Sequence, residues 1–164
     1  MSPGSSLPSA SAVASRTVAS VSAEATRALA ARLADAAQPS DLIALTGDLG
    51  AGKTQFAKGF AAGLGVEATV NSPSFVLMTE YLGRLPLFHL DLYRLADDVD
   101  AWSGGLLDER QADGVTLVEW AERLGATLPA SRLEVHIEGT GDDPRAITMT
   151  APTPGYRRYL EALG

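Results

Sequence analysis

The chain has 164 residues, of which 46% are hydrophobic and 20% charged, a composition that suits one compact domain with a substantial core. The absence of cysteine excludes disulfides and thiolate chemistry, and two histidines are too few to favour a histidine-built zinc site. The formal net charge is −7 and the basic residues are scattered, which disfavours a protein that grips nucleic acid by itself. Because no apolar run could cross a bilayer and the first residues lack a secretory signal, we expect a cytoplasmic protein.

The N-terminal segment is rich in Ser, Ala and Pro and almost free of charged or large apolar side chains. Such a segment buries too little apolar surface to order itself, so we predict a disordered tail over residues 1–15 and a single domain over residues 16–164. Ser22 has the character of a helix N-cap. Apolar residues follow it at steps of three and four as far as Ala36, and Pro39 comes after the predicted end of the helix.

The next segment carries the motif G-x-x-x-x-G-K-T over residues 47–54, directly after the strand-like residues 42–46 and directly before a helical pattern. A loop that wraps a phosphate chain with backbone N–H groups needs conformations that glycine adopts without strain. The first turn of the following helix adds unpaired N–H groups and a favourable dipole. The alternative, an ordinary glycine-rich turn, does not account for the complete pattern with both flanks. The segment therefore predicts a phosphate-binding P-loop.

Within this loop, Lys53 supplies a mobile positive charge for the outer phosphates, and the Thr54 hydroxyl is placed to bind Mg²⁺. We expect the nucleotide to contact a continuous run of residues. These are Asp48, Leu49, Gly50, Ala51, Gly52, Lys53, Thr54 and Gln55.

The second half of the chain reads mainly as strands. Residues 75–81 and 85–92 predict an antiparallel hairpin, and residues 133–138 and 146–151 predict another around a turn rich in Gly, Asp and Pro. Residues 115–118 predict a buried strand that is followed by a short helix. Together with the P-loop, these elements predict an α/β, P-loop NTPase-like three-layer fold. Its central sheet is mixed and mainly parallel, with antiparallel hairpin additions.

Two acidic residues, Asp91 and Glu119, end predicted strands. In open α/β sheets, ligands bind beyond the carboxyl ends of the strands. Either acid is a candidate for the carboxylate that holds Mg²⁺ opposite Thr54, directly or through water, and the other then orients the attacking water. The alternative is that each acid only caps its strand or pairs with a nearby arginine such as Arg94.

A further candidate is the loop of residues 71–75, which carries hydroxyls on both sides of Pro73. Such a loop suits a switch segment near the γ-phosphate and metal, where we place Ser74. The alternative is a Ser-stabilised turn leading into a strand. His89 lies within an apolar run and is interpreted as a packed histidine rather than a catalytic base. Trp120 is open to interpretation as a core aromatic or a ligand contact.

Four segments in this order resemble the bacterial TsaE family, also known as YjeE, whose members are P-loop ATPases of tRNA threonylcarbamoyladenosine biosynthesis. The resemblance extends from about Ser20 to the C-terminal hairpin, and its D-L-Y-R and E-W segments are more specific than the P-loop. The four segments are Gly47 to Thr54, Ser72-Pro73-Ser74-Phe75, His89-Leu90-Asp91-Leu92-Tyr93-Arg94 and Val118-Glu119-Trp120.

The resemblance implies ATP and Mg²⁺ as ligands, with Lys53 on phosphate and Thr54 on the metal. It implies metal or water-positioning roles for Asp91 and Glu119, so we group these acids with Lys53 as catalytic, and a switch role for the loop that contains Ser74. It also implies that the protein works with the TsaD and TsaB proteins, that these partners hold most of the tRNA, and that ATP hydrolysis resets their complex between turnovers.

Two other classes of function share the P-loop. A small-molecule kinase usually needs an arginine-bearing lid, and the adjacent arginines here, Arg157 and Arg158, lie in the terminal segment. A nucleotide-responsive regulatory subunit would bind ATP and hydrolyse it negligibly. A Ras-type GTPase is disfavoured because Asn71, the single asparagine, is not followed by the required lysine. Since no residue is an obvious arginine finger in cis, we expect slow hydrolysis that partner proteins stimulate.

Overall fold

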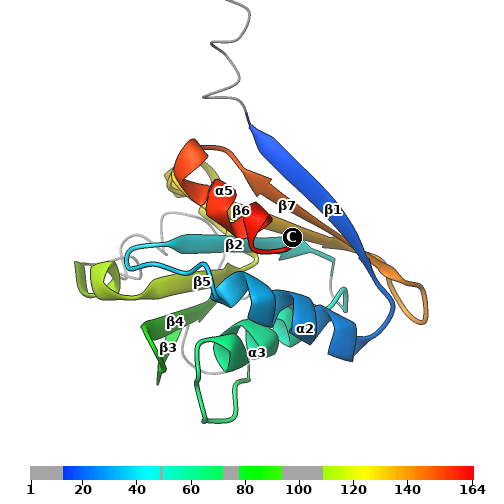
Figure 1. Ribbon diagram of the computed structural model, residues 1–164, viewed down its shortest axis with the longest axis horizontal. Helices are drawn as coiled ribbons and strands as arrows, with labels where there is room; N and C mark the ends of the chain where they lie inside the picture. Colours follow the sequence, from blue (N-terminus) through cyan, green and yellow to red (C-terminus); the bar gives the residue numbers. More distant parts are fainter. Residues whose placement is uncertain (1–12, 49, 72–77, 94–108) are drawn as a thin grey trace, which may run out of the picture.

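The computed structural model describes residues 13–48, 50–71, 78–93 and 109–164 (Figure 1). A seven-stranded sheet forms its centre, in the order β1-β7-β6-β2-β5-β4-β3. The strands are β1 (Ala14–Ser20), β2 (Leu42–Gly47), β3 (Met78–Leu82), β4 (Pro86–Asp91), β5 (Val115–Glu119), β6 (Leu133–Glu138) and β7 (Arg145–Ala151). The helices are α2 (Ala23–Ala34), α3 (Lys53–Gly63) and α5 (Arg157–Glu161), with the 3-10 helices η1 (Glu109–Asp113), η2 (Ala121–Thr127) and η3 (Pro154–Tyr156).

The four central strands, β6, β2, β5 and β4, are parallel to one another. Both predicted hairpins are confirmed, because β3 pairs antiparallel with β4 and β6 pairs antiparallel with β7. The sheet is therefore mixed, with a parallel centre and antiparallel additions, as the sequence predicts. The parallel centre matters for function because it brings the carboxyl ends of β2, β4 and β5 to one edge of the sheet.

Strand β1 is absent from the sequence predictions. It pairs antiparallel with β7 along its whole length, from Ala14 opposite Ala151 to Ser20 opposite Arg145. The predicted tail is therefore wrong at its end, since Ala14 and Ser15 belong to this strand, whereas residues 1–12 lie outside the described residues. An edge strand made of small and polar residues carries little apolar alternation, so its pattern gives no signal.

Two apolar clusters form the core, one on each face of the sheet. The larger cluster packs α2, α3 and residues of the C-terminal segment onto one face, where Ile43 and Leu117 project from β2 and β5. The smaller cluster joins Ala44 and Val118, on the opposite face, to Leu124 of η2. None of the helices in the described ranges is long and apolar enough to cross a membrane.

The first predicted helix begins where expected, because the Ser22 hydroxyl oxygen accepts a hydrogen bond of 3.0 Å from the Ala25 N–H. Helix α2 then lies directly against α3 (Figure 1). The two backbones approach so closely at Gly59 that a Cβ there would lie 2.2 Å from the Arg27 carbonyl oxygen. This contact packs the middle of α3, the helix that follows the P-loop, directly against α2.

Replacing Gly59 with alanine is expected to destabilise the fold. The clash with backbone atoms of α2 costs about 1–3 kcal/mol, which outweighs the gain of roughly 1 kcal/mol in helix propensity. The measurement is the free energy of unfolding from urea titration. Gly155→Ala is the matched control, because a Cβ at Gly155 meets no atom of the described residues within 4 Å apart from the adjoining residues. An unchanged or raised unfolding free energy for Gly59→Ala would show that the helices separate without cost.

Candidate nucleotide-binding site

The predicted P-loop joins the end of β2 to the start of α3, as its motif requires. Gly47 has a φ of 141°, and a Cβ there would lie 2.4 Å from the Ile137 carbonyl oxygen of the neighbouring strand β6. Gly50 and Gly52 also have positive φ values, of 83° and 114°, and apart from the adjoining residues no atom of the described chain lies within 4 Å of either Cβ position. The loop therefore needs glycine for conformation at all three positions, and two of them have room beside them for a ligand.

Lys53, the first residue of α3, is only 5% exposed. Its Nζ donates hydrogen bonds to the carbonyl oxygens of Gly47, at 2.5 Å, and of Asp48, at 2.9 Å. The same nitrogen lies 4.0 Å from the centroid of the Trp120 ring. Burial lowers the pKa of Lys53 below its ordinary value, and nearby carboxylates, Glu119 foremost, oppose that shift. The ammonium is thus held against its own loop.

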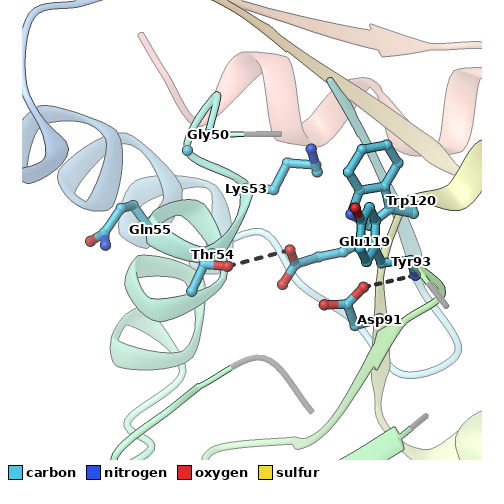
Figure 2. A pocket seen from close by; sticks show the side chains of 9 residues that line it. Gly50, Lys53, Thr54, Gln55, Asp91, Tyr93, Glu119 and Trp120 are labelled. Atoms are coloured by element: carbon cyan, nitrogen blue, oxygen red, sulfur yellow. Dashed lines mark hydrogen bonds between the residues drawn. The ribbon is translucent and has the colours of Figure 1, made fainter. Parts of the chain in front are cut away.

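Thr54 follows Lys53 and faces the end of β5. Its hydroxyl donates to Oε1 of Glu119 across 3.5 Å, at the limit of a hydrogen bond (Figure 2). Glu119 is the last residue of β5 and is only 2% exposed. Its other carboxylate oxygen, Oε2, lies 2.6 Å from Nε2 of His89. The end of β5 therefore places a buried carboxylate beside the first turn of α3.

Asp91 ends β4 and lies opposite Glu119 in the parallel register. It is less buried than Glu119, and its Oδ1 accepts a hydrogen bond of 3.0 Å from the backbone N–H of Tyr93. Figure 2 shows both acids facing the same space as Thr54. The structure thus brings together the two strand-end acids that the sequence singles out.

These side chains line a cleft of about 350 Å³. A second hollow, of about 370 Å³, lies along the other side of the same loop, beside the start of α2 and the turn between β6 and β7. Leu49, Ser74 and Arg94 lie outside the described residues. The residues that line the first cleft are Gly50, Gly52, Lys53, Thr54, Gln55, Asp91, Tyr93, Glu119 and Trp120.

The family model described as threonylcarbamoyl adenosine biosynthesis protein TsaE matches residues 20–147. The chain belongs to the TsaE family. It is 46% identical to the tRNA threonylcarbamoyladenosine biosynthesis protein TsaE of Bacillus subtilis, across 87% of this chain and 90% of that protein. The TsaE of Streptomyces coelicolor is 40% identical, across 76% of this chain and 88% of its own length.

A crystal structure of Bacillus subtilis YdiB has the same fold. The two chains are 41% identical and superpose with a TM-score of 0.76, covering 92% of this chain and 95% of the other. The comparisons confirm both the family resemblance and the P-loop NTPase-like fold that the sequence predicts.

The donor set of this TsaE-family site is compatible with Mg²⁺. The described residues contain no group of three or more acidic, histidine or cysteine side chains placed to hold a metal ion. Mg²⁺ does not require such a group, because it is usually held by one or two carboxylates together with substrate phosphates and water. Thr54 Oγ1 and Glu119 Oε1, which face each other beside the P-loop, supply hard oxygen donors of the right kind.

An aromatic pair forms one wall of the TsaE-family cleft. The rings of Tyr93 and Trp120 have centroids 5.0 Å apart, and Tyr93 is partly exposed. Trp120 has a φ of 59°, which is uncommon for a bulky residue and characteristic of strained positions near functional sites. Trp120 lines the cleft and also packs against the smaller apolar cluster, so both interpretations that the sequence leaves open for it stay open.

Two polar residues near the P-loop make contacts that the sequence does not predict. The interpretation of His89 as a packed histidine is correct for its burial but overlooks its contact with Glu119. The sequence does contain an indication of this role: His89 lies two residues before Asp91 on the same strand, and alternate strand residues share a face, so His89 lies on the face that carries the candidate acid. Arg145 donates to the carbonyl oxygens of Ala51, at 3.0 Å, and of Gly141, at 3.2 Å. Nothing in its sequence context indicates this bridge.

Proposed function

We propose that the chain binds ATP with Mg²⁺ in this cleft and hydrolyses it as part of tRNA threonylcarbamoyladenosine biosynthesis, acting on a complex of TsaD and TsaB proteins. Membership of the TsaE family supports a role in that biosynthesis. The observation that carries the ATP proposal is the placement of Lys53 and Thr54 in the first turn of α3, directly opposite the buried carboxylate of Glu119.

The phosphate chain would lie along the P-loop, at the N-terminus of α3, where free N–H groups and the helix dipole favour anions. Lys53 would exchange its present carbonyl partners for outer phosphate oxygens. Thr54 and Glu119 would hold Mg²⁺, which when bound would neutralise negative charge on the phosphates. Asp91, at the end of the neighbouring strand, would orient the attacking water.

The nucleoside would lie in the second hollow, because the proposed metal ligands Thr54 and Glu119 line the first cleft and are absent from the lining of the second. That hollow offers exposed apolar surface at Val21 for a base and a buried pair of hydroxyls, Ser20 and Thr26, whose oxygens are 2.7 Å apart. Arg145 lines it and braces the P-loop backbone from this side. A nucleotide that spans both hollows would therefore cross the loop at Gly50 and Gly52, which line both.

The lining of the first cleft, where the outer phosphates would lie, supports slow hydrolysis by the isolated chain. No arginine is among the described residues that line it, whereas an arginine finger accelerates P-loop hydrolysis by about 10³- to 10⁵-fold. We place the arginine finger on a partner protein. This feature favours an ATPase that is switched on within a complex over a self-sufficient kinase.

Single-turnover hydrolysis of labelled ATP, with and without purified TsaD and TsaB, tests the proposal. We expect a low rate alone and a rate at least about tenfold higher with the partners, with the phosphate released to water. The Lys53→Ala variant with the same partners is the control for ATPase activity carried by those proteins. Equal rates with and without partners would contradict the proposal, and phosphate transfer to a metabolite would support a kinase instead.

A further inference from the structure

We propose that His89 is a positioning residue that fixes the carboxylate of Glu119, so that Oε1 of Glu119 faces Thr54 and is ready to hold Mg²⁺. This inference rests on the proposed function, because it assigns a supporting residue to the same metal site. His89 itself is 0% exposed and cannot touch a nucleotide. Its role would be carried out entirely through Glu119.

The sheet register places His89 beneath the site. His89 of β4 lies opposite Leu117 of β5, and Glu119 is two residues further along β5. Because alternate residues of a strand share a face, His89 and Glu119 both project to the face that α3 covers. There Nε2 of His89 reaches Oε2 of Glu119 at 2.6 Å, in an interior where both side chains are almost completely buried.

The surroundings of the imidazole indicate which nitrogen carries the proton. Nδ1 of His89 is buried and has no hydrogen-bond partner among the described residues. A buried N–H without a partner is rarer in proteins than a buried lone pair without one, so Nδ1 is the unprotonated nitrogen. Nε2 then carries the hydrogen and donates it to Oε2 of Glu119. His89 therefore makes a specific hydrogen bond to this carboxylate and does more than fill space.

This donation determines how the carboxylate is turned. With Oε2 bound to His89, the other oxygen of Glu119 is directed at the Thr54 hydroxyl, 3.5 Å away. Groups that orient metal ligands in this manner typically contribute about 10- to 100-fold in metal affinity. If His89 only filled space, any side chain of similar volume would serve equally well.

Two amide variants separate positioning from packing. Glutamine at position 89 places its amide nitrogen near the position of Nε2, whereas asparagine places its amide nitrogen near Nδ1, too short to reach Glu119. Both keep a polar side chain at the site, and thermal melting identifies any variant that does not fold. His136→Gln is the matched control, because His136 bonds to Thr46 on an exposed part of the sheet, away from the cleft.

The binding measurement is calorimetric titration with ATP, in the presence and absence of Mg²⁺. Mg²⁺ is expected to raise the affinity for ATP in the wild-type chain. In His89→Asn we expect this Mg²⁺-dependent increase to be about 10- to 100-fold smaller, while the affinity for ATP without Mg²⁺ changes little. His89→Gln and His136→Gln should retain that gain. A His89→Asn variant with the full gain would overturn the role of His89 alone. A wild-type chain without any gain would overturn the proposed metal site, and the role of His89 with it.

A spectroscopic measurement needs neither nucleotide nor metal. In the nucleotide-free chain labelled with ¹⁵N-histidine, we expect His89 to show the tautomer protonated at Nε2, with a proton that exchanges slowly with water. The Nδ1-protonated tautomer, or rapid exchange at Nε2, would overturn the proposed donation to Glu119 whatever the binding data show.

Discussion

Lys53→Ala is expected to weaken ATP binding by roughly 10- to 150-fold, which corresponds to the loss of about 1.5–3 kcal/mol for a hydrogen bond to a charged group. The reason lies in the present contacts of the ammonium. Lys53 is bound to two neutral carbonyl oxygens, of Gly47 and Asp48, and burial lowers its pKa. Phosphate oxygens offer this desolvated cation far stronger partners.

The stability of the Lys53→Ala variant without nucleotide provides an internal check. Because the wild-type ammonium is desolvated, its removal should leave the free energy of unfolding unchanged or slightly higher. The matched control is Lys58→Ala, which removes a lysine from the same helix outside the residues that line the cleft. Calorimetric titration with ATP measures both variants. Wild-type affinity in Lys53→Ala would contradict the assignment of the phosphate site.

Glu119→Gln is expected to lower the Mg²⁺-dependent rate of hydrolysis by about 10²- to 10³-fold, the range found when one well-placed electrostatic group is removed from an active site. Glutamine keeps the shape of the side chain and a hydrogen-bond acceptor for His89, but it lacks the negative charge that a metal ligand requires. Nucleotide binding without Mg²⁺ should change little, since Lys53 and the loop remain.

The measurement for Glu119→Gln is single-turnover hydrolysis in the presence of the partner proteins, over a range of Mg²⁺ concentrations. Glu138→Gln serves as the control, because Glu138 is an exposed acid at the end of β6. An unchanged Mg²⁺ dependence in Glu119→Gln would reject Glu119 as the metal ligand and direct attention to Asp91, which lines the same cleft.

The elements with strong local patterns are predictable from the sequence. The P-loop motif has a fixed spacing and needs glycine, so the positive φ values of Gly47, Gly50 and Gly52 follow from it. The two hairpins carry turn residues between apolar runs, and the strand-end positions of Asp91 and Glu119 follow from the ends of those runs. Parallel pairing of β5 with both β2 and β4 then brings the acids to the loop.

Features that depend on contacts between distant segments are not predictable in this way. Strand β1 is ordered by β7, which lies far along the chain, and its own sequence lacks a hydrophobic pattern. The bond between His89 and Glu119 depends on the relative register of two strands, and the bridge from Arg145 to the P-loop depends on how a hairpin turn lies against the loop. None of these is a local property of the residues concerned.

The most direct test is a crystal structure of the chain with Mg²⁺ and a non-hydrolysable ATP analogue. We predict that the phosphates lie on the backbone N–H groups at the start of α3, with Lys53 Nζ transferred from the loop carbonyls to a phosphate oxygen. Mg²⁺ should lie between the phosphates, the Thr54 hydroxyl and the Glu119 carboxylate. A nucleotide bound elsewhere, or a metal that contacts neither Thr54 nor Glu119, would contradict the proposed site.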